Sequence, residues 1–158
     1  MGHALFYHLT RSGAEDVVRL LAGRALAMGW RVVLRGSDAA ALARLDERLW
    51  LEPADGFLPH GMAGGRHDAR QPLLLTTGTV LPEGARALMV VDGAGVTADE
   101  VARLERVWIV FDGADPAALE TARAQWRALT AAGAEAEYWS EESGRWQMKT
   151  ARRAAPSG

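Results

Sequence analysis

Cysteine is absent from the chain, and lysine occurs once, at Lys149. The lack of cysteine excludes disulfide bonds and cysteine-ligated zinc, and it suits a reducing compartment. No apolar run approaches the roughly 20 residues that a membrane-spanning helix needs, and the first residues lack a signal-peptide pattern. The net charge of −2 gives no overall basic field to attract nucleic acid. We therefore expect a cytoplasmic protein that neither spans a membrane nor binds nucleic acid directly.

The motifs that hold nucleotide phosphates are also missing. The turn after the first expected strand reads TRSGAE, with one glycine, and GAG at 93–95 lacks the third glycine of a dinucleotide site. No GxxxxGK[ST] stretch and no GxSxG elbow occur. We expect no cofactor and no catalytic residue set.

Hydrophobic residues make up 49% of the 158 residues, enough for the core of one domain. Apolar strand-like runs alternate with amphipathic helical patterns. Strands are predicted at 4–9, 30–36, 71–77, 85–93, 106–113, 134–139 and 145–149. Helices are predicted at 12–28, 38–50 and 116–132, with a further short helix that starts at Thr97. This order predicts a single-domain α/β fold, Rossmann-like, with an open, largely parallel sheet and helices on both faces. The last two strands flank a short polar turn and can pair as an antiparallel hairpin. We expect the domain to cover 1–149 and a flexible tail to cover 150–158.

Local signals fix the expected helix ends. Ser12 and Thr97 each precede a glutamate by three residues, the spacing of a capping box. Asp115 followed by proline predicts another helix start. The expected inward faces are Val17, Leu20, Leu21 and Met28 in the first helix, and Leu42, Leu45 and Leu49 in the second.

Few side chains are candidates for metal binding or catalysis. His60 and His67 share a loop with Asp68 and could ligate a metal, but the spacing matches no established pattern, so a structural hydrogen bond is favoured. Asp92 and Asp112 each end a strand, where catalytic acids of α/β enzymes often lie. Both precede glycine, and turn chemistry explains them more simply. We predict no metal site.

The helix at 116–132 is more informative. Leu119, Ala122, Trp126 and Leu129 form its apolar stripe, and Arg123 and Arg127 lie four residues apart beside that stripe. The simpler interpretation is a core helix with two solvated arginines. The functional interpretation is a shallow apolar pocket with a guanidinium rim, which suits a peptide that ends in an aromatic residue and a carboxylate.

The loop at 51–71 raises a second question because it is apolar for a loop. Phe57 and Leu58 stand next to a proline, with Trp50 shortly before them. Trp50 is expected to be mostly buried. Phe57 and Leu58 either tuck under the loop or form an exposed patch that meets a partner.

Four stretches resemble the chi subunit of bacterial DNA polymerase III. They are FYHL at 6–9, LDERLW..P...FLPHG at 45–61, RAQWRALTAAG at 123–133 and GRWQMK at 144–149. The resemblance implies a Rossmann-like fold without nucleotide chemistry and a non-catalytic, accessory role in the clamp loader during DNA replication. It further implies binding of the acidic C-terminal tail of single-stranded-DNA-binding protein and, in many bacteria, of the psi subunit.

The resemblance assigns residues to both partners. The family's tail-binding helix carries a basic residue, an aromatic residue and a second basic residue, which Arg123, Trp126 and Arg127 match. Some members carry a further lysine earlier on this helix, where this chain has Leu119. The surface that carries Phe57 and Leu58 would meet psi or other clamp-loader components. The alternative is a diverged nucleotide-binding or hydrolytic α/β enzyme, and the acidic charge balance argues against a direct DNA binder.

Overall fold

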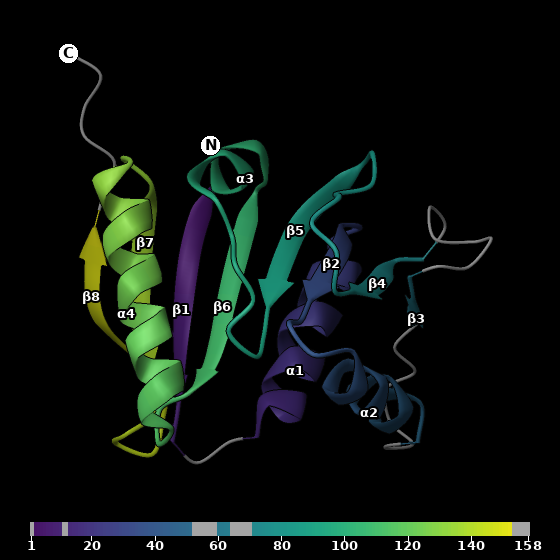
Figure 1. Ribbon diagram of the computed structural model, residues 1–158, viewed down its shortest axis with the longest axis horizontal. Coiled ribbons are helices and arrows are strands. Elements are labelled where there is room, and N and C mark those ends of the chain that lie inside the picture. Colours follow the sequence, from purple (N-terminus) through teal and green to yellow (C-terminus); the bar gives the residue numbers. More distant parts are fainter. Residues whose placement is uncertain (1, 11–12, 52–59, 64–70, 153–158) are drawn as a thin grey trace.

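In the computed structural model, the strands form one sheet in the order β3-β4-β2-β5-β6-β1-β7-β8 (Figure 1). The structure describes residues 2–10, 13–51, 60–63 and 71–152, without the side chains of residues 50 and 51. The strands are β1 (His3–Leu9), β2 (Arg31–Arg35), β3 (His60–Met62), β4 (Leu73–Thr76), β5 (Ala85–Val90), β6 (Arg106–Asp112), β7 (Glu135–Ser140) and β8 (Gln147–Arg152). The helices are α1 (Ala14–Ala27), α2 (Ala39–Leu51), α3 (Ala98–Arg103) and α4 (Pro116–Ala131).

Neighbouring strands run parallel except at one edge, where β7 and β8 pair antiparallel. The α/β class, the largely parallel sheet and the C-terminal hairpin are thus confirmed. β3 was not predicted, and it lies within the stretch expected to be a loop. β8 continues to Arg152, three residues beyond the expected end of its strand. Residues 153–158 lie outside the described part, so the proposed flexible tail stays a prediction.

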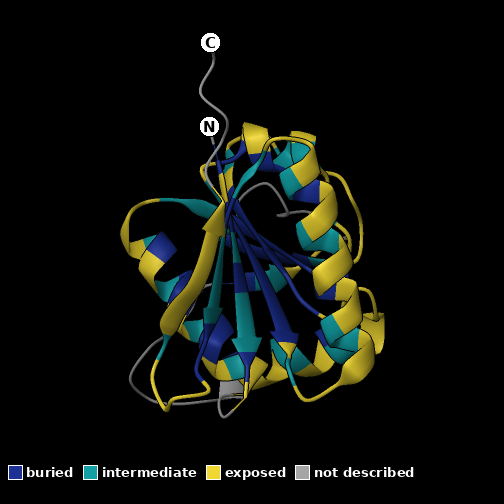
Figure 2. Ribbon diagram, turned by 90° about the vertical axis from the view of Figure 1, so that its left-hand side faces the viewer, coloured by how far each residue is buried: buried dark blue, intermediate teal, exposed yellow. Residues whose placement is uncertain are grey.

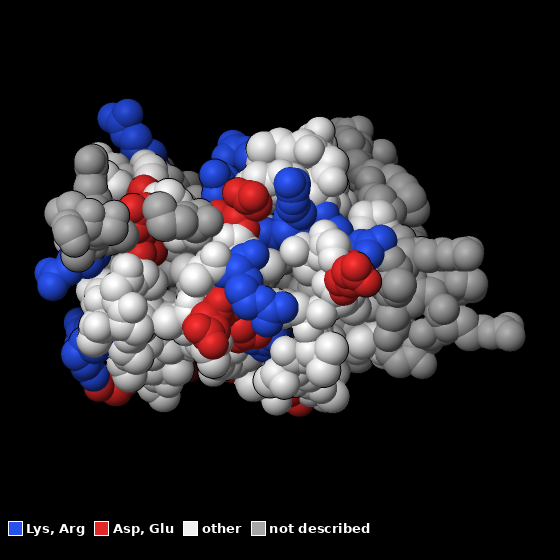
Figure 3. Space-filling model, turned by 90° about the horizontal axis from the view of Figure 1, so that it is seen from above, with Lys and Arg blue, Asp and Glu red and all other residues white. Residues whose placement is uncertain are grey.

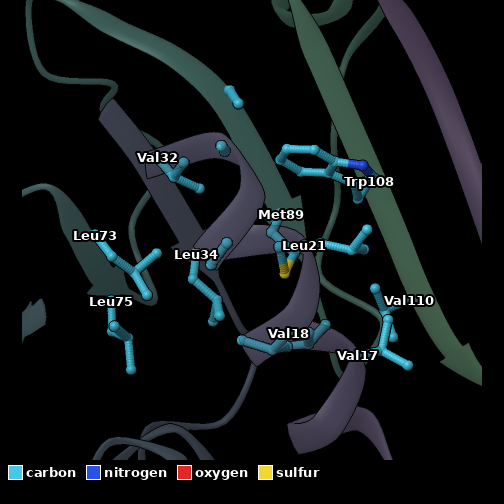
Figure 4. Packing of buried hydrophobic residues seen from close by; sticks show 14 of the residues in the cluster. Val17, Val18, Leu21, Val32, Leu34, Leu73, Leu75, Met89, Trp108 and Val110 are labelled. Carbon is cyan, nitrogen blue, oxygen red and sulfur yellow. The ribbon is translucent and has the colours of Figure 1, made fainter. Parts of the chain in front are cut away.

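Side chains alternate between two cores, one on each face of the sheet. On one face, Val17, Val18 and Leu21 of α1 pack onto strand residues that include Leu34 and Trp108 (Figure 4). On the other face, residues of α3 and α4 cover the opposite sides of the same strands. The central strands are therefore buried, whereas β8 is exposed along its length (Figure 2). This arrangement leaves β8 as an accessible edge beside α4.

The helix ends test the capping predictions. Thr97 caps α3 in a complete capping box with Glu100, and the Asp115 carboxylate accepts a hydrogen bond from the Ala117 amide at 3.0 Å. Both predictions are confirmed. The capping box predicted at Ser12 is wrong, because α1 begins after Gly13, which makes no side-chain cap.

The inward face of α1 also differs from the prediction. Leu20 is 45% and Met28 is 52% exposed, whereas Val17 and Leu21 are buried. The buried stripe continues through Val18, Ala22 and Ala25 instead. Alanine residues contribute little to a sequence pattern, yet they allow the helix to approach the sheet closely. In α2, by contrast, Leu42 and Leu49 are buried and Leu45 packs against the same core, as predicted.

Candidate functional site

The site predicted at Arg123, Trp126 and Arg127 lies on α4, which packs against β6 and β7. Ala122 and Leu129 anchor the helix in the core, each 2% exposed. Trp126 is half-buried, with its ring centroid 5.3 Å from Phe6 and 6.1 Å from Tyr138 in edge-on geometry. Such contacts fix the indole ring. Trp126 is therefore part of the wall between core and surface.

The two arginines are both exposed, but their surroundings differ. Arg127 lies 3.6 Å from the Glu120 carboxylate, in an ion pair whose two side chains are at least 65% exposed. Such a solvated pair contributes little to stability and is easily exchanged for another partner. Arg123 forms no ion pair with a described carboxylate, and it lines a hollow beside the helix. Arg123 is thus the arginine with the more direct access to a ligand in that hollow.

This hollow, which we call the α4 hollow, has a volume of about 460 Å³ and lies between α4 and the β7–β8 hairpin. It is lined by His8, Leu119, Arg123, Tyr138, Ser140, Glu142, Lys149 and Thr150. Trp126 and Arg127 are not in its lining; Trp126 adjoins it through Tyr138. An apolar wall, a phenol ring and cationic side chains therefore surround one concave surface.

A polar pair, His8 and Tyr138, lies in the lining of the α4 hollow. The Tyr138 hydroxyl lies 2.7 Å from His8 Nδ1. Burial raises the pKa of Tyr138, and Glu142 raises it further, whereas the Arg123 guanidinium opposes the shift. The phenol therefore stays protonated at neutral pH. A Cβ atom at position 113 would collide with the His8 ring, so Gly113 leaves the room that the imidazole occupies.

Sequence reasoning missed several lining residues. His8, Tyr138 and Lys149 lie far from α4 in sequence, and only the pairing of β1, β7 and β8 brings them to it. Alternation along β1 offered one signal, because His8 shares a side of its strand with Phe6. The register then places Phe6 beside Tyr138, on the face that α4 covers.

Other candidate residues have structural surroundings. His60 is buried, and its Nε2 lies 3.2 Å from the carbonyl oxygen of Asp46, in line with the structural hydrogen bond favoured from the sequence. The Asp112 carboxylate accepts a hydrogen bond from the Ala114 amide at 2.9 Å, which is turn chemistry. Within the described ranges, no three metal-binding side chains cluster. His67 and Asp68 lie outside those ranges, as do Phe57 and Leu58; the Trp50 side chain is also not described.

A larger hollow, of about 680 Å³, lies at the carboxyl ends of β1, β5 and β6, where α/β folds often bind nucleotides. Its lining includes Asp38, Asp92, Asp112 and Asp115. Burial raises the pKa of Asp92, Asp38 raises it further, and Arg44 opposes them. The concentration of carboxylates makes this position unfavourable for phosphate groups.

The sequence was compared with protein families and with curated proteins. A family model described as "DNA polymerase III chi subunit, HolC" matches residues 1–137. The chain belongs to the DNA polymerase III chi subunit family. DNA polymerase III subunit chi of Escherichia coli (strain K12) is 37% identical over 71 residues, which are 40% of this chain and 48% of that protein. The alignment thus spans about half the length of this relative. The family match ends within β7, before Lys149.

Two further features concern the distribution of surface charge and the apolar character of the helices. Seen from the amino ends of the parallel strands, basic and acidic side chains are interspersed, without a basic stripe among the described residues in view (Figure 3). Among the helices that the structure describes, none is long and apolar enough to cross a membrane.

Proposed function

We propose that this chi-family chain binds the acidic C-terminal tail of single-stranded-DNA-binding protein and links it to the clamp loader during DNA replication. The observation that carries the proposal is the position of Arg123 at the α4 hollow, beside Leu119 and Tyr138. The guanidinium can hold a carboxylate with two parallel hydrogen bonds. The leucine and the phenol offer an apolar surface for an aromatic ring. Trp126 supports this wall, and Arg127 adds a second cation on the same helix.

The chemistry of the tail fits these features. An acidic tail that ends in an aromatic residue offers a terminal carboxylate, a ring and nearby aspartates. Charge-assisted hydrogen bonds contribute about 1.5–3 kcal/mol each, and burial of a phenylalanine contributes about 1.5–3 kcal/mol. Association costs several kcal/mol. After that cost a few kcal/mol remain, which corresponds to weak binding with a Kd of about millimolar.

Charge reversal on α4 tests the site. The probe is a synthetic peptide of aspartates ending in phenylalanine with a free carboxylate, titrated by calorimetry. We expect Arg123→Glu to weaken binding by about tenfold or more. Arg127→Glu should weaken it less, because Arg127 is not in the lining of the hollow. Added salt should weaken wild-type binding, since charges supply much of the affinity.

Arg44→Glu is the matched control, because it makes the same change of charge on α2, on the other face of the sheet. We expect it to bind the peptide like wild type. If Arg123→Glu and Arg127→Glu also bind like wild type, the site is not on α4. Thermal melts of each variant would confirm that the fold is retained.

The second proposed interface, with psi or other clamp-loader components, rests on Phe57 and Leu58. Both residues lie outside the described ranges, so this role stays a prediction from the family resemblance. The peptide experiment on α4 is independent of it.

A further inference from the structure

The pairing of β7 with β8 contains an irregularity at the only lysine of the chain. Trp139 pairs with Met148, and the preceding residue, Tyr138, pairs with Thr150. Lys149 is therefore the extra residue of a β-bulge, without a partner on β7. Bulges bend the strand and redirect a side chain, and they are common beside functional sites.

The bulge interrupts the alternation of side chains along β8 between Lys149 and Thr150. In a regular strand, consecutive side chains point to opposite faces. Here the consecutive residues Lys149 and Thr150 both line the α4 hollow. Met148 and Ala151 instead line a separate hollow of about 270 Å³, together with Glu137. Without the extra residue, Lys149 and Thr150 would lie on opposite faces.

The charges of the α4 hollow show what Lys149 adds to it. Lys149 is exposed, and no ion pair joins it to a carboxylate among the described residues. Arg123 contributes a second cation from α4, and Glu142 contributes an acid from the turn after β7. The hollow therefore carries cations from two different elements, with one carboxylate that weakens their combined field.

We infer that Lys149, which lies in the β8 bulge and lines the α4 hollow, is a binding residue for an acidic peptide. The peptide would lie between α4 and the hairpin, with Arg123 on one side and Lys149 on the other. A lysine ammonium is a compact charge on a flexible stem, so it can follow a carboxylate whose position varies. This inference rests on the proposed function. It assigns a binding residue on β8, which lies after the residues that the family model matches.

An exchange of two neighbouring residues tests the inference. The double variant Met148→Lys/Lys149→Met keeps the composition and net charge but moves the cation to the other face of β8. With the same aspartate-rich peptide, we expect this variant and Lys149→Gln each to bind about fivefold more weakly than wild type. Met148→Gln is the matched control and should bind like wild type. Glu142→Gln removes the opposing carboxylate and should bind about twofold more tightly.

The outcomes separate the two proposals. If wild type binds, Arg123→Glu does not, and the exchange variant stays within about twofold of wild type, the role of Lys149 is wrong and the α4 site stands. Weaker binding by Glu142→Gln would also contradict the inference. If wild type does not bind the peptide at all, both the proposed function and the role of Lys149 fail. Circular dichroism of the exchange variant would show that β8 still pairs.

Discussion

A buried arginine at the end of β2, Arg35, connects the sheet to neighbouring segments through its hydrogen bonds. Arg35 is 2% exposed, and its guanidinium donates two hydrogen bonds, of 2.9 and 2.7 Å, to the Glu100 carboxylate. It also donates to the carbonyl oxygens of Gly78, Thr79 and Gly95. The ion pair thus ties α3 and two loops to the sheet. A buried charge of this kind is stable only when its donors are satisfied.

The Arg35–Glu100 pair predicts a pH-dependent stability. Burial alone would raise the pKa of Glu100, but hydrogen bonds from Arg35 and Thr97 outweigh it and lower that pKa. We expect Glu100→Gln to reduce the free energy of unfolding by about 3 kcal/mol at neutral pH. The one acceptor oxygen of glutamine can retain the capping box, so the loss reports the charge and the hydrogen bond that Arg35 donates to the second carboxylate oxygen. Urea unfolding of both proteins measures the difference.

The sign of the pH effect follows from the lowered pKa. Wild type holds this stabilisation above the ordinary glutamate pKa and loses it as the pH falls through the folded-state pKa. The difference between wild type and Glu100→Gln should therefore shrink toward acidic pH. Glu120→Gln, at an exposed ion pair, should change stability by less than about 0.5 kcal/mol. A constant difference across the pH range would contradict the assignment.

At the scale of elements, the sequence correctly predicted features that depend only on neighbouring residues, such as two helix caps. The caps at Thr97 and Asp115 depend on neighbours within a few residues, and both were readable from the sequence. β3 has three residues and forms because β4 lies beside it, so no local pattern marks it. The bulge at Lys149 likewise depends on the register with β7. The sequence suggested a pocket with a guanidinium rim on the helix at 116–132, but it could not show the walls of the α4 hollow that come from distant strands.

The start of α4 offers a prediction about an element. The Asp115 carboxylate accepts from the Ala117 amide, and Pro116 fixes the first helical residue. Asp115→Ala should lower the free energy of unfolding by about 1 kcal/mol, because an amide loses its acceptor. Asp115→Asn keeps an acceptor oxygen and should stay close to wild type. Thermal melts would measure both, and equal losses in the two variants would show that the cap does not operate through this hydrogen bond.

At the scale of the molecule, the sequence predicted the fold class and the missing phosphate motifs, but not the acidic lining of the hollow of about 680 Å³. Its carboxylates come from three separate segments, at or just after the ends of β2, β5 and β6, which only the sheet order brings together. We predict that neither ATP nor NAD, at about millimolar concentration, raises the melting temperature, because a ligand specific for the folded state must stabilise it. A clear upward shift would favour the alternative of a diverged nucleotide-binding enzyme.

The position of β1 inside the sheet has a consequence for how the chain acquires its structure. β1 precedes the other strands of this sheet in the chain, yet its neighbours are β6 and β7, which come more than 90 residues later. β2, β4 and β5 can pair with one another before those strands exist. During translation, the apolar residues Phe6 and Leu9 therefore wait for partners about a hundred residues away, and such distant closure is slow. We therefore expect the strand that supplies His8 to the α4 hollow to enter the sheet late, once β6 and β7 are available to pair with it.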